Sequence, residues 1–268
     1  MKPKLTLSCS VTESHLKEFL LLKYSAELFH ECEWFLSCDQ FCFDYLNQFV
    51  GCHCENLDLQ NGKVFGDEKE ISNFYGVIEG KFRATERAIK KRGECLLVDS
   101  DIIFSAPIPK GQFSRENAAI LSPHFQWNKE MDNAWGFFNV GFVMIKDIDF
   151  LYSWKEETAK AGNQFEQLPI QKVVESEKYS VGVLPIEFNM GWWRFNNQMS
   201  QFRVNSFYIA NNCICFDGHI VNSFHCHTFI DCQHSKRFKD FIFDLLHKTQ
   251  DGKLILAKYN ELKTWSAH

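Results

Sequence analysis

Apolar residues follow two different spacings along the first 110 residues of the chain. Four apolar runs have the length of a strand, at residues 5–11, 34–37, 50–54 and 95–98. Between them, apolar residues recur with helical spacing at residues 14–30, 41–49 and 74–92, and the polar segment 56–72 is expected to form a loop. This alternation of strands and helices predicts an α/β fold, with a mixed, mostly parallel sheet flanked by helices.

The second half of the chain has a less regular pattern. Strand-like runs lie at residues 118–122, 139–145, 181–184 and 219–227, and helical spacing returns at 150–161 and 168–177. From Lys236 to about Trp265, apolar residues predict two amphipathic helices. We expect one domain over residues 1–232, whose halves meet near residue 110, and a helical C-terminal appendage over 233–268 packed on the same domain.

The composition is that of an ordinary globular domain, because 45% of the 268 residues are hydrophobic and 24% are charged. A formal net charge of −5 predicts no basic surface for nucleic acid, and no apolar run reaches the roughly 18 residues of a transmembrane helix. The start of the chain lacks the apolar core of a secretion signal, so we expect a cytoplasmic protein. The eleven cysteines, an odd number, lie within predicted helices and strands and are expected to be reduced thiols.

Asp99, Ser100 and Asp101 interrupt an apolar segment that runs from Cys95 to Phe104. Burying two like charges so close together is costly unless a cation compensates them. A hard divalent cation bound through oxygen atoms is a natural compensator, especially one that also holds phosphate groups. The motif follows a predicted strand, and ligands of parallel sheets bind beyond the carboxyl ends of the strands. Acidic pairs also form turns and cap helices, so the motif alone leaves that alternative open.

The segment resembles the DxD motif of the GT-A glycosyltransferases, which use nucleotide-sugar donors. The resemblance extends over about residues 5–230, in ordered fragments. It implies a GT-A, Rossmann-like fold in which residues 1–110 bind the nucleotide and residues 111–232 bind the acceptor. It also implies that Asp99 and Asp101 hold Mn²⁺ or Mg²⁺, that the donor is a UDP-sugar, and that the acceptor is a hydroxyl group of a glycan, a protein or a small molecule.

Two fragments match the donor-binding residues of these enzymes. Lys81 and Arg83, on the helix before the motif, correspond to the cations that contact the donor phosphates or sugar, and Ser100 is expected to line the same site. In the Asn139-x-Gly141 fragment, the amide would contact the donor sugar and the glycine would let the backbone pass close to it. The alternatives are a solvated helix face for the two cations and a strand bulge at the glycine.

The remaining fragments resemble the reacting centre of the family and its metal-binding histidine. Glu166 and Gln167 are similar to an acid–amide pair with a catalytic role, in which the carboxylate would bind or deprotonate the acceptor hydroxyl and the amide would stabilise the sugar. Asn189 lies in a Leu-Pro-x-x-Phe-Asn segment that is expected beside this pair. His225 is the first choice as the third metal ligand and His227 the second, because alternate residues of a strand face the same side. The order of the fragments is closer to that of retaining enzymes.

Three other functions remain open at this stage. A non-catalytic nucleotide-sugar binder would keep both aspartates. A sugar-phosphate nucleotidyltransferase would need a glycine-rich loop after the first strand, where the chain reads Ser-Cys-Ser-Val-Thr-Glu. A zinc-stabilised interaction module could use a cluster whose spacing matches no standard zinc pattern, formed by His225, His227, Cys232 and His234. Separately, the pair Trp192–Trp193 is either a sugar-stacking platform for the acceptor or part of the core.

Overall fold

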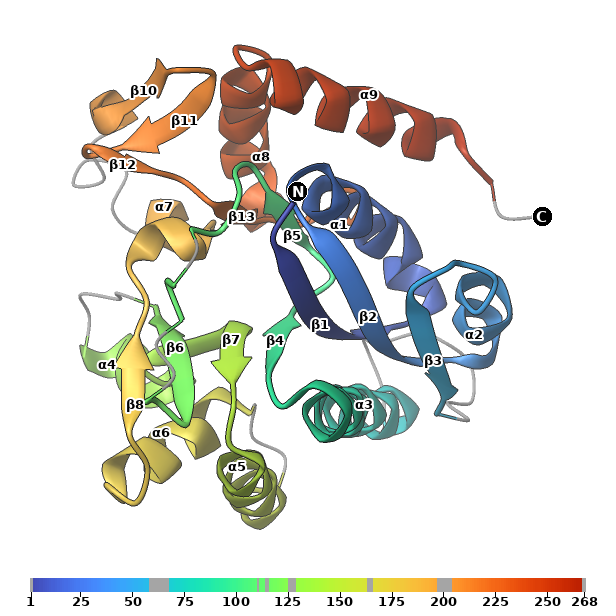
Figure 1. Cartoon of the computed structure of the whole chain (residues 1–268), viewed down its shortest axis with the longest axis vertical. Coiled ribbons are helices and arrows are strands. Elements are labelled where there is room, and N and C mark those ends of the chain that lie inside the picture. The colour runs from blue at the N-terminus through green and yellow to red at the C-terminus, as the bar shows by residue number, and fades with distance from the viewer. Residues whose placement is uncertain are drawn as a thin grey trace.

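The structure is a computed structural model that describes residues 2–57, 68–109, 111–113, 116–124, 129–162, 166–196 and 204–266. Within these ranges the chain forms an α/β fold (Figure 1). The strands are β1 (Lys4–Val11), β2 (Glu31–Cys38), β3 (Cys52–Asn56), β4 (Cys95–Val98), β5 (Ile102–Phe104), β6 (Ala119–Pro123), β7 (Phe138–Ile145), β8 (Val181–Val183), β9 (Met190–Gly191), β10 (Phe207–Ala210), β11 (Cys213–Phe216), β12 (His219–Ile220) and β13 (Ser223–His225). The helices are α1 (Leu16–Phe29), α2 (Gln40–Leu46), α3 (Glu68–Arg92), α4 (Lys129–Trp135), α5 (Ile148–Lys160), α6 (Gln167–Glu175), α7 (Trp193–Asn196), α8 (Gln233–Leu246) and α9 (Gln250–Thr264).

The largest sheet in the described ranges has the strand order β3-β2-β1-β4-β7-β6-β8. Strand β1 runs parallel to β2 and β4, β2 runs parallel to β3, and β6 runs parallel to β8. Strand β7 is antiparallel to both of its neighbours, β4 and β6. The prediction of a mixed, mostly parallel sheet is therefore confirmed. Helices α1 and α2 each lead the chain to a parallel neighbouring strand, whereas α3 leads from β3 across the sheet to β4, on the other side of β1.

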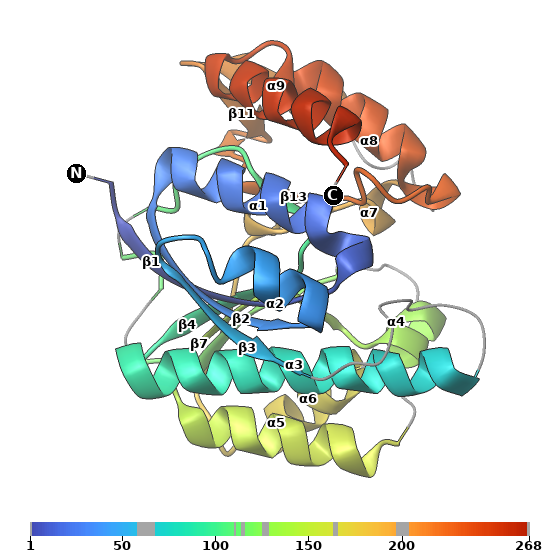
Figure 2. The same ribbon diagram turned by 90° about the vertical axis from the view of Figure 1, so that its right-hand side faces the viewer.

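Two hydrophobic cores lie on the two faces of this sheet, as β4 illustrates. Its residues Leu96 and Val98 face a core shared with α1, α2, α8 and α9, whereas Cys95 and Leu97 face a core shared with α3, α5 and α6. The period of two in β4 sends alternate side chains to opposite faces, which explains why all four positions are apolar. Figure 2 shows the resulting layers, with the sheet between α3, α5 and α6 on one side and α1 and α2 on the other.

The C-terminal helix α9 packs on α1, α8 packs on α9, and both helices contribute to the core on that face (Figure 1). Phe238, Ile242 and Ile255 are among the side chains that these helices bury. The helical C-terminal part expected from the amphipathic pattern is therefore present, and the domain boundary at residue 232 stays a prediction. Among the described residues, no helix combines the length and the apolar character that crossing a bilayer requires. The eleven cysteines all lie in described ranges and form no disulfide bond.

Several elements differ from their predicted bounds by two or three residues, and two differ by more. Helix α3 begins at Glu68, six residues before the predicted start, and residues 58–67 of the predicted loop lie outside the described part of the chain. The strand predicted over 219–227 is divided into β12 and β13, because these two pieces pair with different sheets. Strand β12 extends the small sheet of β10 and β11, whereas β13 lies between β5 and β9. The small sheet β5-β13-β9 contributes residues to the candidate site.

Candidate active site

The Asp99–Asp101 segment lies where β4 ends and β5 begins. The backbone N–H of Asp99 donates to the carbonyl oxygen of Gly141 at 2.9 Å, which joins the end of β4 to the neighbouring strand β7. Ser100 and Asp101 are buried, with 9% and 5% of their surfaces exposed, and Asp99 is partly exposed. One carboxylate is therefore enclosed by protein, while the other borders the surface.

The small sheet β5-β13-β9 brings His225 to the two aspartates. In this sheet His225 pairs with Ile102, the residue after Asp101, and the N–H of Cys226 donates to the Asp101 carbonyl at 2.9 Å. The His225 Nε2 atom lies 3.1 Å from Asp101 Oδ1 and 3.8 Å from Asp99 Oδ2. Asp101 and His225, 124 positions apart in the sequence, thus meet because β5 and β13 pair.

Asp99, Asp101 and His225 form a group that fits a divalent metal ion. Their ligand atoms all lie within 4.8 Å of one another. Two carboxylates and one imidazole, with no thiolate, suit Mn²⁺ or Mg²⁺ better than a metal that prefers sulfur. Oxygen-rich sets of this kind also leave coordination positions for the phosphates of a ligand.

A chain of hydrogen bonds orients the imidazole of His225. Its Nδ1 donates to Asn189 Oδ1 at 3.2 Å, and Asn189 Nδ2 in turn donates to Asn139 Oδ1 at 2.8 Å. The Gly141 N–H also donates to Asn139 Oδ1, at 3.0 Å. Because this hydrogen bond turns Nδ1 toward Asn189, Nε2 is the ring nitrogen that would bind a metal ion held together with the carboxylates.

Gly141 provides the space in which His225 and Asp99 approach each other. A Cβ atom at this position would lie 2.7 Å from Asp99 Oδ2, and it would also clash with the ring of His225. Strand β7 bulges here, because Val143 pairs with Leu121 while Asn139 pairs with the next residue of β6, which leaves residues 140–142 without partners on that strand. The bulge re-aims Asn139 and Gly141 toward the site.

Lys81, on α3, is held between two carboxylates. Its Nζ lies 2.7 Å from Asp99 Oδ1 and 2.7 Å from Glu166 Oε1. Burial alone would lower the pKa of Lys81, but the two carboxylates outweigh it and raise the pKa above its ordinary value. Next to Glu166, Gln167 Oε1 accepts a long hydrogen bond of 3.4 Å from Asn139 Nδ2. Both residues of the acid–amide pair are thus linked to the same network.

His227 contacts the other oxygen of the enclosed aspartate. Its Nδ1 atom lies 2.9 Å from Asp101 Oδ2. Burial would lower the pKa of His227, but the carboxylate of Asp101 outweighs it and raises the pKa to about 9. Burial would likewise raise the pKa of Asp101, whereas His225 and His227 hold it well below its usual range. The aspartate therefore stays ionised between two histidines.

Not every predicted site residue lies in this network. Arg83 is exposed and forms an ion pair with Glu55 on β3 rather than with the aspartates. Ser100 is buried between the aspartates. Of the proposed zinc cluster, Cys232 does not join this metal-ligand group, and the side chain of His234 lies outside the described part of the chain. The geometry favours an oxygen-rich metal site over a zinc cluster.

The structure adds residues that the sequence analysis did not single out. His124 follows β6, donates from Nδ1 to the Gly136 carbonyl at 2.9 Å, and accepts from Asn139 at its Nε2 at 3.1 Å. The ring of Trp193 packs edge-on against His124 and His225, with centroid distances of 5.3 Å and 4.8 Å. The available signal for His124 was a histidine two residues after the strand predicted over 118–122. Trp193 thus supports the metal-site histidine, and its role toward an acceptor stays a prediction.

We expect the buried His124 to make the fold sensitive to acid. Burial lowers the pKa of His124 to about 4, so the unfolded chain, with a pKa near 6.5, takes up a proton first as the pH falls. The stabilisation present above pH 6.5 is therefore lost toward pH 4, about 2 kcal/mol of it between pH 7 and pH 5. Urea unfolding at both pH values should show His124→Asn losing about 2 kcal/mol less than the wild type. Equal losses in the two proteins would contradict this assignment.

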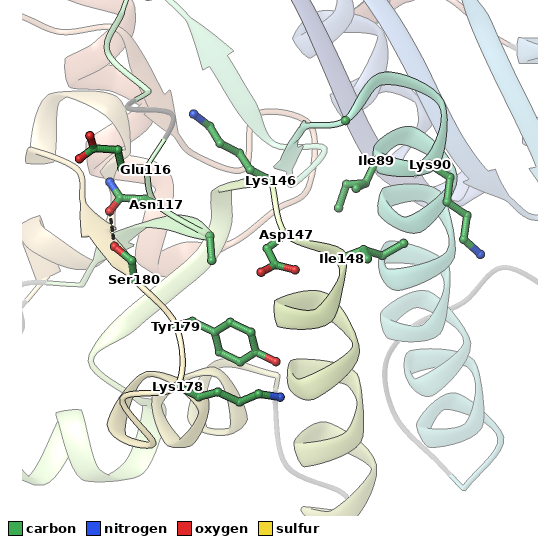
Figure 3. Close-up of a pocket in the computed structure, with 12 residues that line it drawn as sticks. Ile89, Lys90, Glu116, Asn117, Lys146, Asp147, Ile148, Lys178, Tyr179 and Ser180 are labelled. Carbon is green, nitrogen blue, oxygen red and sulfur yellow. Dashed lines mark hydrogen bonds between the residues drawn. The ribbon is translucent and has the colours of Figure 1, made fainter.

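A cavity of about 640 Å³ lies at the opposite end of the strands, away from the aspartates (Figure 3). It is bordered by the end of α3, the start of α5 and the segment before β8, where Ser180 donates to Asn117 at 2.9 Å. The residues that line it include lysines and carboxylates but no histidine, and none of them belongs to the possible metal-ligand group. The chemistry of the chain is therefore concentrated at the carboxyl end of β4, as expected for a parallel sheet.

No protein-family model matches the chain, and no curated protein matches it. Among solved structures, the galactosyltransferase LgtC in complex with donor and acceptor sugar analogues matches with a TM-score of 0.57 and 12% identity, over 98% of each chain. The glycosyltransferase GlyE of Streptococcus pneumoniae TIGR4 matches the whole chain over 66% of its own length, with a TM-score of 0.53 and 13% identity. Mouse xyloside xylosyltransferase 1 matches 86% of the chain over 99% of its own length, with a TM-score of 0.50 and 11% identity. At these identities the likeness is one of fold, and by that likeness the chain has the GT-A fold of glycosyltransferases.

Proposed function

We propose that the protein is a metal-dependent glycosyltransferase that moves a sugar from a nucleotide-diphosphate sugar, a UDP-sugar, to a hydroxyl acceptor. The observation that carries this proposal is the convergence of Asp99, Asp101 and His225 at the end of β4, within a GT-A fold. A structural acidic turn would need neither the histidine nor the glycine that lets it approach. The acceptor is a glycan, a protein or a small molecule, and the proposed location is the cytoplasm.

Asp99, Asp101 and His225 would hold Mn²⁺ or Mg²⁺. Such an ion supplies positive charge that stabilises the diphosphate as it leaves the sugar. Asn189 and Asn139 keep the His225 ring in the orientation that this ligand set needs. Lys81 keeps Asp99 and Glu166 close together despite their like charges, since its ammonium group contacts both. Arg83 and Ser100 remain proposed donor contacts.

Glu166 and Gln167 are the proposed catalytic pair. Glu166 is buried, and its ion pair with Lys81 fixes the position of the carboxylate. In this position it would bind or deprotonate the acceptor hydroxyl, while the amide of Gln167 would face the sugar beside Asn139. The order of these fragments along the chain resembles that of retaining enzymes, so we include retention of the anomeric configuration in the proposal.

An assay of nucleotide release tests the proposal. The purified protein is incubated with a panel of UDP- and GDP-sugars and a mixture of hydroxyl acceptors, and free nucleoside diphosphate and glycosylated product are measured. We expect release from a UDP-sugar in the presence of Mn²⁺ and its loss when EDTA removes the metal. Proton NMR of the product would then report the anomeric configuration. Binding of nucleotide-sugar without release from any donor would instead identify a non-catalytic binder.

A further inference from the structure

Glu18 is a buried carboxylate that the proposed reaction does not use. It lies in the first turn of α1, with only 2% of its surface exposed. Its Oε1 atom accepts hydrogen bonds from the backbone N–H groups of Thr228 and Phe229, both at 2.8 Å, and of Ile230 at 3.4 Å. Its Oε2 atom accepts from the hydroxyl of Thr228. A single side chain therefore bonds a segment that is 210 residues away in the sequence.

These contacts explain how the charge of Glu18 is tolerated in the core. An isolated buried carboxylate is strongly unfavourable unless hydrogen bonds satisfy its oxygens. Consecutive backbone N–H groups that converge on one point form an anion-binding concavity, and Glu18 fills the one made by residues 228–230. Burial raises the pKa of Glu18, and the hydrogen bonds from Thr228 and Phe229 act in the opposite direction. The contact is thus a specific anchor rather than incidental packing.

The anchored segment directly follows the two histidines of the candidate site. On its upstream side, β13 is fixed by its pairing with β5 and by the hydrogen bond from Cys226 to the Asp101 carbonyl. On its downstream side, the hydrogen bonds of Glu18 hold residues 228–230. His227 lies between these two anchors, where it contacts Asp101. Lys239 Nζ also donates to the Thr228 carbonyl at 3.3 Å, but Glu18 supplies most of the described hydrogen bonds at this end of the segment.

We propose that Glu18 is a positioning residue that holds the His225–His227 segment against Asp101. The inference rests on the proposed function only in taking this cluster to bind a metal. It also assigns the concavity of residues 228–230 to the protein's own carboxylate instead of to a ligand phosphate. The two assignments predict opposite changes in nucleotide affinity when the carboxylate of Glu18 is removed. If the concavity were a phosphate site blocked by Glu18, removing the carboxylate would strengthen nucleotide binding; an anchor predicts that binding weakens.

Four variants test this role through Mn²⁺ binding, measured by calorimetry without any nucleotide. Glu18→Ala removes every anchoring bond and is expected to weaken Mn²⁺ binding by about tenfold or more, as is usual for residues that orient metal ligands. Glu18→Asp keeps the charge but is too short to reach all its partners, and a smaller loss in the same direction is expected. Glu18→Gln keeps an oxygen for the backbone N–H groups, so its affinity is expected to stay within about threefold of the wild type.

Glu27→Ala, on the same helix, is the matched control. Glu27 contacts Lys23 and accepts from Trp34 Nε1, so its loss is expected to lower the melting temperature without changing Mn²⁺ affinity. Hydrogen exchange of metal-free Glu18→Ala should accelerate at residues 226–230. If Glu18→Ala does not fold, the Mn²⁺ affinity of Glu18→Asp is compared with those of the wild type and Glu27→Ala instead.

Wild-type affinity in a folded Glu18→Ala or Glu18→Asp variant would overturn the inference and leave the proposed function intact. Tighter UDP binding in Glu18→Ala, measured with Mn²⁺ present, would also overturn it, in favour of a blocked phosphate site. Absence of Mn²⁺ binding by the wild type would overturn the proposed function, and this inference with it. The two failures are therefore distinguishable in one set of titrations.

Discussion

Replacing Asp101 with asparagine is expected to weaken Mn²⁺ binding by at least about 100-fold and to abolish metal-dependent binding of a nucleotide. Residues that only orient metal ligands already contribute about 10- to 100-fold to affinity, and a direct ligand contributes no less. Asparagine keeps the size of the side chain but removes the charge that faces His225 and His227. Calorimetry with Mn²⁺, and then with UDP in its presence, measures both effects.

Asp149→Asn is the control for this substitution, because it makes the same chemical change at an exposed position in the first turn of α5. That helix begins at the opposite end of the strands, so this variant should bind Mn²⁺ and UDP as the wild type does. If Asp101→Asn bound both ligands normally, the acidic segment would be a structural turn and the metal site would lie elsewhere.

Gly141→Ala should disrupt the site by adding a single methyl group. The new Cβ would lie 2.7 Å from Asp99 Oδ2 and would clash with the ring of His225, so the two proposed metal ligands must move apart. Overpacking of this kind costs about 1–3 kcal/mol of folding stability. Because the displaced groups are the ligands themselves, we expect Mn²⁺ affinity to fall by more than about tenfold. Thermal unfolding and metal titration of the same preparation separate the two effects.

Gly93→Ala provides the comparison for Gly141→Ala. Gly93 has a φ of 83°, and no atom lies within 4 Å of an added Cβ atom, so alanine there strains the backbone without touching other groups. A loss of about 1 kcal/mol with unchanged Mn²⁺ affinity is the expected result. A Gly141→Ala variant that behaved like Gly93→Ala would show that the site accommodates the methyl group.

The first half of the fold could be predicted because its elements are long and regularly spaced. Strands β1 and β2 and helix α1 each contain several periods of their apolar pattern, so their type and order were readable. Strands such as β9, with two residues, contain no period at all. They exist because a distant segment pairs with them, as β13 pairs with β9 and β5, and such pairing is not written in the local sequence.

In the candidate site, too, the local motifs could be predicted from the sequence, whereas the contacts between distant residues could not. The Asp99–Asp101 motif and the Asn139-x-Gly141 fragment are local patterns, and the structure brings them together. The close approach at Gly141, however, is to Asp99 and His225, whereas the sequence pattern predicts an approach to the donor sugar. Lys81 and Arg83 lie two positions apart on one helix and so about 200° apart around its axis. The sequence could not decide which of them faces Asp99, because the orientation of α3 decides it.

The role of Glu18 could not be predicted from the sequence either, because it also depends on a distant segment. Its position in an amphipathic helix resembles that of any charged residue, and only the return of the chain at residues 228–230 gives it partners.

Calorimetric titration of the wild-type protein with UDP, with and without Mn²⁺, tests the central claim most directly. The claim is that Asp99, Asp101 and His225 hold a metal ion that in turn holds the donor's diphosphate. It predicts that UDP binds when Mn²⁺ is present and binds far more weakly, or not at all, when EDTA has removed the metal. UDP binding that is equally strong in both conditions, or absent from both, would contradict the claim.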